Sequence, residues 1–269
     1  MDFYGCYFQY AGKPSYDYGL RIVNVTTQEN KSMSGRTESM SVFNKRTRTR
    51  TYIGSDYQDS PIQFDIEIVS DIPIERKNER AIQKWLFNRS GYKKLYIRGE
   101  DYAELHNDEA KELFLNCRFI NPQKLEYNGG LVGYKCTMEC DSYLAWQDPI
   151  TNRFTFENTT TNSSQNIQVE IDTDMEGYTY PKVTITMGSS GGNISIVNHT
   201  DDSGRITSFE NLTPNANIVV NGMYNYVSGN YYEKFVNRNF IRMLDGKNSF
   251  TLSGDISAIT FEWSNRRYI

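Results

Sequence analysis

Hydrophobic and polar residues alternate with a period of two along much of the first half of the chain. The clearest case is residues 62–68, where four apolar residues alternate with Gln63, Asp65 and Glu67. Such alternation places successive side chains on opposite faces of a strand. With the accompanying aromatic and β-branched residues, it predicts strands within residues 3–10, 18–25, 40–53, 60–70, 93–97, 112–127 and 130–146.

One segment of the first half has a helical period instead. Between Pro73 and Gly91, apolar residues recur at three- and four-residue spacing opposite a charged face, at Ile74, Ala81, Ile82, Trp85 and Leu86. We therefore expect one amphipathic helix within residues 75–89. The Asn-Gly-Gly sequence at Asn128 to Gly130 predicts a hairpin turn. The first half is thus predicted to be a sheet that carries a single helix.

The second half has strand patterns almost throughout. Short alternating segments separated by turn residues recur about every ten residues, at 166–173, 180–188, 192–200, 206–212, 217–223, 248–254 and 258–263. This spacing is typical of a β-sandwich or jelly roll. We expect no helix in this half, so the whole chain is predicted to be mainly β.

A change of composition divides the chain of 269 residues into two predicted domains. Residues 1–150 hold 20 Lys and Arg and 21 Asp and Glu, whereas residues 151–269 hold 9 and 12, and Asn rises from 9 to 16. The break falls near Pro149, and the Thr/Asn/Ser-rich stretch around 159–166 is interpreted as a loop or linker. We place the domains at residues 1–147 and 148–269.

Composition and charge exclude several classes of protein. No apolar run reaches the ~18 residues of a membrane span, and the N-terminus has no signal-peptide pattern, so we expect neither membrane insertion nor secretion by such a signal. The net charge of −4 argues against bulk nucleic-acid binding. The four cysteines are too few for a disulfide scaffold, so we expect packed thiols and synthesis in the cytoplasm.

Residues for catalysis or metal binding are scarce. The two histidines, His106 and His199, lie in different predicted domains, which leaves no set of partners for a catalytic triad. Cys136 and Cys140 would be ~13 Å apart along a strand, too far to share one zinc ion. We predict no metal site, no cofactor and no enzyme activity.

Two further patterns have both a functional and a structural interpretation. Asp172 with Asp174, or Asp201 with Asp202, offers carboxylates for Ca²⁺ or for a glycosidic bond, or else belongs to a solvated turn. The glycine-rich segment 188–193 lies between two predicted strands with no helix to hold a phosphate, so we interpret it as a hairpin loop.

A basic run and a tyrosine cluster are the candidate contact surfaces. In a strand, the arginines of the run would share one face, either to contact another subunit or passing DNA in a pore, or to protect a sheet edge. The tyrosines around 227–230 offer rigid faces for a sugar or a protein, or they pack at a sandwich edge. The basic run is Lys45, Arg46, Arg48 and Arg50, and the tyrosine cluster is Tyr224, Tyr226, Tyr231 and Tyr232.

The order of these segments resembles the distal tail protein of long-tailed bacteriophages. The resemblance rests on the SYDYGL opening at 15–20, the helix with Trp85 and Leu86, the segments 94–105 and 130–146, and the closing segment 240–263. Within the closing segment, the short signature consists of Leu244, Gly246, Asn248, Ser253 and Gly254. The resemblance covers essentially the whole chain, and none of its motifs is catalytic.

The resemblance implies an N-terminal β-sandwich with a helix that closes into a homohexameric ring, and an outward-facing galectin-like C-terminal β-sandwich. The ring would be an adaptor in the virion that joins the tail tube to the tail-tip hub, with DNA passing through its lumen. The outer domains would hold receptor-binding proteins or fibres. Arg46, Arg48 and Arg50 would then contact another subunit or the lumen. Galectin-type sugar binding is not expected, since His199 and Trp263 lack the galectin spacing.

Two other functions remain open. The first is a carbohydrate-binding or adhesion module that stacks host cell-wall sugars on the tyrosine cluster. The second is a glycoside hydrolase using paired carboxylates such as Asp172 and Asp174, although no acid and base face each other on strands that we can identify. A structural virion protein at the tail tip is the leading interpretation.

Overall fold

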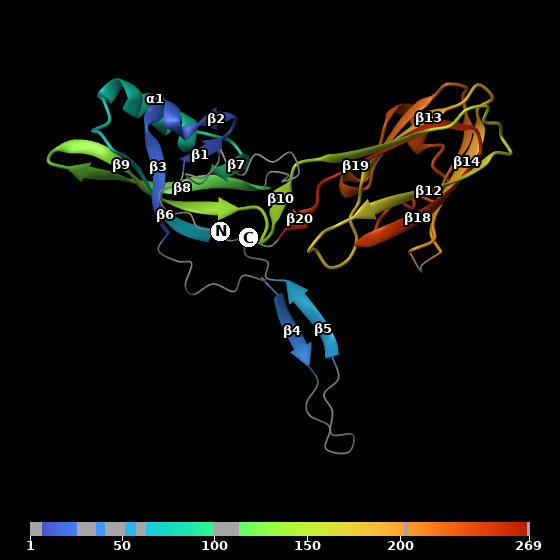
Figure 1. Cartoon of the computed structure of the whole chain (residues 1–269), viewed down its shortest axis with the longest axis horizontal. Helices are drawn as coiled ribbons and strands as arrows, with labels where there is room; N and C mark the ends of the chain where they lie inside the picture. The colour runs from blue at the N-terminus through green and yellow to red at the C-terminus, as the bar shows by residue number, and fades with distance from the viewer. Residues whose placement is uncertain are drawn as a thin grey trace, which may run out of the picture. The chain divides into compact units, whose positions relative to one another are not determined.

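The computed structural model describes residues 7–25, 36–40, 52–57, 63–98, 113–201 and 204–267. The chain forms two compact units that divide between Trp146 and Gln147, one residue before the predicted boundary. Antiparallel sheets dominate both units, and the described ranges contain one α-helix (Figure 1). The prediction of a mainly β protein with a single helix is confirmed. Whether the units have ring-forming and galectin-like roles stays a prediction.

The first unit is built on one antiparallel sheet with the strand order β2-β1-β7-β8-β9-β6-β3. Strands β4 and β5 pair separately with each other, and β10 crosses the boundary between the units, with Gln147 on the side of the second. The elements of this unit are β1 (Tyr7–Tyr10), β2 (Lys13–Pro14), η1 (Ser15–Tyr18), β3 (Leu20–Val25), β4 (Arg36–Met40), β5 (Tyr52–Tyr57), β6 (Gln63–Ser70), α1 (Arg76–Leu86), β7 (Lys93–Arg98), β8 (Leu113–Tyr127), β9 (Gly130–Cys140) and β10 (Ala145–Gln147).

Helix α1 closes the core of the first unit. Its apolar residues Ile82, Trp85 and Leu86 are buried, as its period predicts. The Trp85 ring stacks against Phe8, with 5.8 Å between ring centroids, and its Nε1 donates a hydrogen bond of 2.8 Å to the Tyr10 carbonyl oxygen. A tryptophan with its polar atom satisfied is stable in a core, so this side chain fixes the helix against β1.

Two other sequence predictions for the first unit are confirmed. Alternate residues of β6 are buried, with Phe64, Ile66 and Ile68 in the core. The turn between β8 and β9 has positive φ at both central residues, 48° at Asn128 and 77° at Gly129. Asn-Gly is the preferred sequence for such a two-residue hairpin turn.

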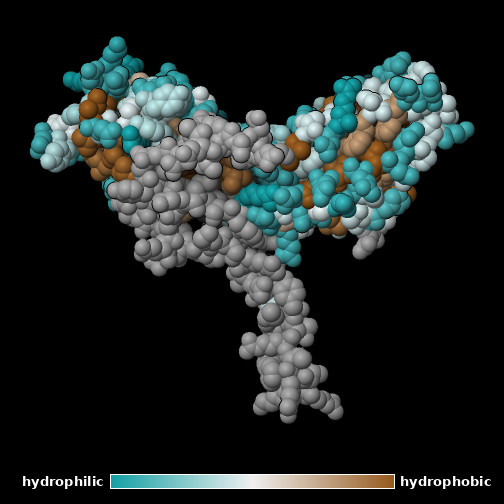
Figure 2. Space-filling model, viewed as in Figure 1, coloured by the Kyte–Doolittle hydropathy of each residue, from teal (hydrophilic) through white to brown (hydrophobic). Residues whose placement is uncertain are grey.

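The second unit is a β-sandwich. One sheet has the order β11-β19-β13-β16-β17 and the other β12-β18-β14-β15, and apolar residues of both form one core. Figure 2 shows hydrophobic residues in the middle of this unit, bordered by hydrophilic ones. Its elements are β11 (Ile150–Thr155), β12 (Ser164–Ile171), β13 (Lys182–Met187), β14 (Gly192–Asn198), β15 (Ile206–Leu212), β16 (Asn217–Asn221), η4 (Gly222–Tyr224), β17 (Tyr226–Val227), η5 (Gly229–Tyr232), β18 (Gly246–Ser253), β19 (Ile256–Trp263) and β20 (Arg266–Arg267).

Two local predictions for the second unit are corrected. The predicted loop or linker 159–166 is a loop only at 159–163, because residues 164–166 begin β12, and before it the unpredicted strand β11 runs along β19 at residues 150–155. The glycine-rich segment 188–193 is not a hairpin, because it connects β13 in one sheet with β14 in the other. Sequence alternation locates strands, but it does not assign them to a sheet.

The short signatures of the sequence have structural roles. In the opening signature, the Ser15 hydroxyl accepts a 2.9 Å hydrogen bond from the Phe8 amide, and Gly19 ends η1 with φ of 63°. In the closing signature, the buried Asn248 side chain bonds both the amide and the carbonyl of Leu244, at 2.9 and 2.7 Å. In both signatures a polar side chain, Ser15 or Asn248, forms the hydrogen bond with the backbone that another backbone group would otherwise form. The position of each residue in its signature follows from that bond.

Candidate interaction surfaces

The predicted basic contact surface cannot be placed. Lys45, Arg46, Arg48 and Arg50 lie outside the described residues, in the sequence between β4 and β5. Their role in a subunit or lumen contact stays a prediction.

The predicted tyrosine cluster lies at the edge of the five-stranded sheet of the second unit. Tyr226 is in the edge strand β17, Tyr224 in η4 and Tyr231 with Tyr232 in η5. Tyr224 is 71% exposed, Tyr226 52% and Tyr232 41%, whereas Tyr231 packs partly against the core. Three members of the cluster therefore present aromatic surface to solvent and the fourth anchors the segment.

The backbone under these tyrosines is held on both sides. Ser228 exchanges hydrogen bonds of 2.8 and 2.9 Å with Val219 of β16. Further along, Phe235 stacks on Phe209 of β15 with 4.7 Å between ring centroids. The Arg238 guanidinium lies 4.9 Å from the Tyr232 ring, within cation–π range. A rigid backbone with aromatic and cationic side chains suits contact with a partner or a sugar.

The acidic pairs noted in the sequence form ion pairs. Arg267 binds both Asp172 and Asp174, and these hydrogen bonds raise the pKa of its guanidinium. Asp201 is buried and receives two hydrogen bonds from Arg242, at 2.6 and 3.0 Å. Asp202 lies outside the described residues. The interpretation as a solvated turn therefore fits the exposed Asp172 and Asp174, but it is wrong for Asp201, which is buried in an ion pair.

The glycine-rich segment 188–193 surrounds a carboxylate of the chain itself. The buried Asp255 side chain accepts hydrogen bonds from the amides of Ser190 and Gly191, at 2.6 and 2.9 Å, and from the Thr159 hydroxyl at 2.7 Å. Burial raises the pKa of this carboxyl, but the three hydrogen bonds outweigh burial and hold the pKa below its usual value. A Cβ at Gly188 would lie 2.0 Å from the Asp255 Oδ1 atom, which explains the glycine.

The remaining candidate residues of the second unit do not form a galectin-like site. Trp263 is 5% exposed, and its Nε1 donates a 3.0 Å hydrogen bond to Asn265. His199 is exposed after β14, in the other sheet, with its Nε2 2.7 Å from the Thr251 hydroxyl. The tryptophan is therefore part of the core and unable to stack on a sugar.

Three cysteines belong to the core of the first unit. Cys117, Cys136 and Cys140 are buried free thiols, as predicted, while Cys6 is outside the described residues. Burial raises the pKa of Cys136 to about 12, which keeps this thiol protonated and unreactive. Within the described ranges, no three His, Cys, Asp or Glu side chains group into a metal site. No described helix has the length and apolar character needed to cross a membrane.

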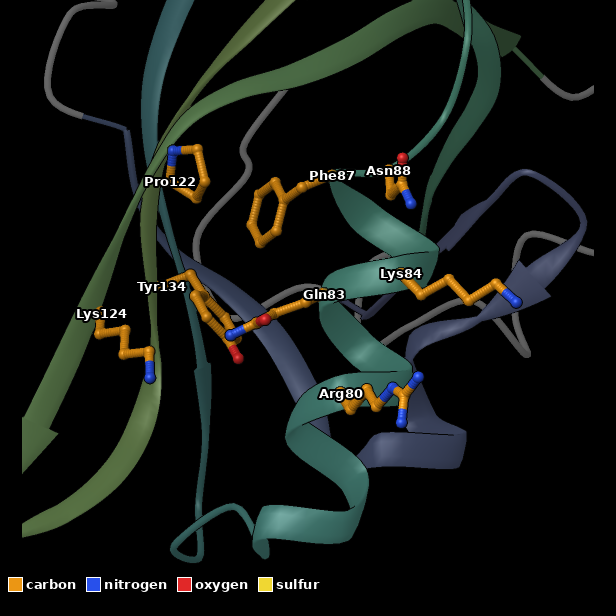
Figure 3. A pocket seen from close by; sticks show the side chains of 8 residues that line it. All are labelled: Arg80, Gln83, Lys84, Phe87, Asn88, Pro122, Lys124 and Tyr134. Carbon is orange, nitrogen blue, oxygen red and sulfur yellow. The ribbon is translucent and has the colours of Figure 1, made fainter.

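A groove between α1 and the β8–β9 pair was missed by the sequence analysis. Arg80, Lys84 and Phe87 line its helix side, and Pro122 and Lys124 of β8 with Tyr134 of β9 line the other (Figure 3). The spacing of Arg80 and Lys84 on the polar face of the predicted helix was the available signal. Sequence alone gives no indication that Lys124, forty residues after Lys84, lies opposite them.

Comparisons with known proteins assign the chain to a family. A family model described as a phage tail protein N-terminal domain matches residues 3–142, and one described as a phage tail C-terminal domain matches residues 145–263. No curated protein sequence matches the chain.

Solved structures share the fold over nearly the whole chain. The crystal structure of the Dit protein of phage SPP1, described as a paradigm of the hub adsorption apparatus of phages infecting Gram-positive hosts, is 11% identical with a TM-score of 0.65. The match covers 96% of this chain and 98% of that one. A chain of the phage P2 baseplate in its activated conformation with Ca is 9% identical, with a TM-score of 0.53 and 97% of each chain covered. The resemblance found in the sequence is confirmed, and the chain belongs to a family of phage tail proteins.

Proposed function

We propose that this protein is a structural adaptor at the tip of the phage tail, where copies of it form a ring between the tail tube and the tail-tip hub. The observation that carries this proposal is the likeness to SPP1 Dit, which extends over both units and 96% of the chain. The two family-model matches support the same assignment. The protein would be made in the host cytoplasm and assembled into the virion.

The first unit is the better candidate for ring formation. Among the described strands, its sheet ends in β3 on one side and in β2 on the other, and a sheet edge offers hydrogen-bonding groups to another subunit. A closed ring needs two different complementary surfaces on each subunit. A homohexamer would leave a lumen for DNA in passage, with the second unit outside it to hold receptor-binding proteins or fibres.

The solution mass across a dilution series tests ring formation. Light scattering should give a species of about 187 kDa, six times the 31.2 kDa of one chain, and negative-stain images should show an open centre. An affinity tag on the chain, located by gold labelling of virions, tests the position in the tail. Label along the tube or on the head would contradict a place at the tip.

A second function, binding of host cell-wall sugars, is favoured by the exposed Tyr224 and Tyr226. Tyrosine rings stack on sugar rings, and the Arg238 guanidinium lies over the ring of Tyr232, another member of the cluster. The full chain on a glycan array should then bind wall polysaccharides, and Tyr224→Ala with Tyr226→Ala should abolish that binding. Binding that survives in the double variant would rule out this surface as the sugar site.

A further inference from the structure

The groove between α1 and the β8–β9 pair has the charge and the shape of a peptide-binding site. Its volume is about 630 Å³, and the residues that line it include three cations and no carboxylate. We name it the basic groove, after Arg80, Lys84 and Lys124. Lys124 spans the groove to Glu79 of α1, with 2.6 Å between Nζ and Oε1. Arg80 and Lys84 are exposed and make no ion pair within the described chain.

The floor of the basic groove is apolar and includes a buried hydroxyl. Phe87 packs edge-on against Tyr134, with 5.3 Å between ring centroids, and Pro122 lies on the β8 side. Tyr134 is 1% exposed, and its hydroxyl lies beside Gln83 without a hydrogen bond of normal geometry (Figure 3). A buried hydroxyl without a good partner favours a ligand that brings an acceptor oxygen. An acidic peptide with an apolar side chain would pack that side chain on the floor of the groove and pair its carboxylates with the cations.

The chain itself contains such a sequence. Between Glu100 and Glu112 there are six carboxylates and one lysine, so this short stretch carries more negative charge than the whole chain, whose net charge is −4. Tyr102 and Leu105 within it supply apolar anchors. We refer to residues 99–112 as the acidic segment; they lie outside the described residues.

Chain length makes the groove of another subunit the better binding site. The acidic segment leaves β7 at Arg98 and enters the paired strand β8 at Leu113, so it starts and ends at one end of the sheet. Fourteen residues held at both ends reach out by at most about 25 Å. Pro122 is nine residues along β8 from Leu113, about 30 Å at ~3.3 Å per residue. The backbone of the acidic segment therefore stops short of the β8 side of the groove in the same chain, which favours the groove of another subunit.

We propose that the acidic segment of one subunit binds the basic groove of its neighbour. This inference rests on the proposed ring, because it needs a second copy held beside the first. The contact is heterologous, with a different surface on each partner, and such contacts close into rings when the rotation between subunits fits. Salt should weaken it, because the pairing charges lie at the protein surface.

A charge exchange in the full chain tests the pairing. Arg80→Glu with Lys84→Glu should weaken self-association at least tenfold in dilution light scattering. Adding Glu104→Lys with Glu109→Lys to the same chain should restore association, since opposite charges again face each other. The matched control is Arg76→Glu with Lys77→Glu, which makes the same change on exposed residues of α1 that do not line the groove. The control should stay within twofold of the wild type.

The outcomes separate this proposal from the ring itself. If the wild type forms rings and the groove variant forms them equally well, or if the exchange restores nothing, the pairing is wrong and the ring stands. If the wild type is monomeric, a fluorescent peptide of residues 99–112 is titrated into the full chain. Salt-sensitive binding that the groove variant loses tenfold supports the pairing without a ring, and no binding overturns it. A DNA oligonucleotide that displaces the peptide from the groove would assign the groove to DNA instead and also overturn it.

Discussion

The two units close their cores in different ways. In the first, one helix covers the sheet, and the Trp85 side chain provides both the stacking and the hydrogen bond that hold the helix in place. In the second, two sheets cover each other, and buried carboxylates such as Asp201 and Asp255 hold the connecting loops by hydrogen bonds and ion pairs. Both units have an apolar core, but the helix of the first unit depends on one aromatic side chain, whereas the loops of the second depend on buried carboxylates. Substitutions should therefore destabilise the two units in different ways.

The largest effect is expected for Trp85→Ala. Truncating a buried tryptophan costs about 4 kcal/mol of unfolding free energy, and here the helix also loses its bond to Tyr10. Urea unfolding combined with hydrogen exchange should place the loss in the first unit and leave β12–β19 protected. Trp85→Phe keeps the stacking and should lose less. Equal loss of protection in both units would contradict the separation of the cores.

Next in size is Arg242→Met, at about 3 kcal/mol, because it leaves the Asp201 carboxylate buried without its partner. The Arg242 guanidinium also lies 3.6 Å from the Tyr178 ring, a contact that the variant loses. Adding Asp201→Leu should recover much of the stability, since an apolar pair can replace a buried ion pair. Chemical denaturation measures the free energy of unfolding of both variants. A double variant less stable than Arg242→Met would contradict the predicted recovery.

Asp255→Asn should cost about 2 kcal/mol at neutral pH, since the amide replaces a carboxylate that accepts three hydrogen bonds. The folded pKa of Asp255 lies below that of the unfolded chain, so its contribution is complete above the unfolded value of about 3.9. As the pH falls through the folded pKa, that contribution is lost. The stability difference between wild type and variant should therefore shrink below about pH 4. Glu157→Gln, an exposed change in the loop that carries Thr159, should leave the wild-type pH profile unaltered.

The smallest effect is expected at the turn between β8 and β9. Asn128→Ala places an alanine at φ of 48°, which costs about 1 kcal/mol. Asn128→Gly should be close to neutral, because glycine adopts this conformation freely. Thermal unfolding of the two variants measures the difference. An alanine variant as stable as the glycine variant would show that the turn rearranges.

The sequence predicted the elements that local periodicity defines. Helix α1 and strand β6 each follow from one uninterrupted pattern, and the Asn-Gly turn follows from its residue types. Strand β11 was missed because its Thr- and Asn-rich sequence lies beside the linker-like stretch. Its strand character depends on β19, about a hundred residues away in sequence.

Long-range contacts account for what the sequence did not predict about the candidate surfaces. Gly188 is required by the Asp255 carboxylate, more than sixty residues away, and Gly191 by the close approach of the Leu212 carbonyl. The basic groove needs Lys124 opposite α1, and that pairing arises from the long β8–β9 hairpin. The tyrosine cluster was identified from residue type, but only the structure distinguishes the exposed Tyr224 from the anchoring Tyr231.

The strand order of the second unit has a consequence for biosynthesis. Its first strand, β11, lies along β19, and its second, β12, lies along β18, so each sheet joins the beginning of the unit to its end. A chain emerging from the ribosome cannot form these pairs until β18 and β19 have left the exit tunnel. The first unit can meanwhile begin folding, since domains generally fold as units in order of synthesis. A chain that stops before β18 should therefore lack a strand partner for both β11 and β12, and its second unit should not fold.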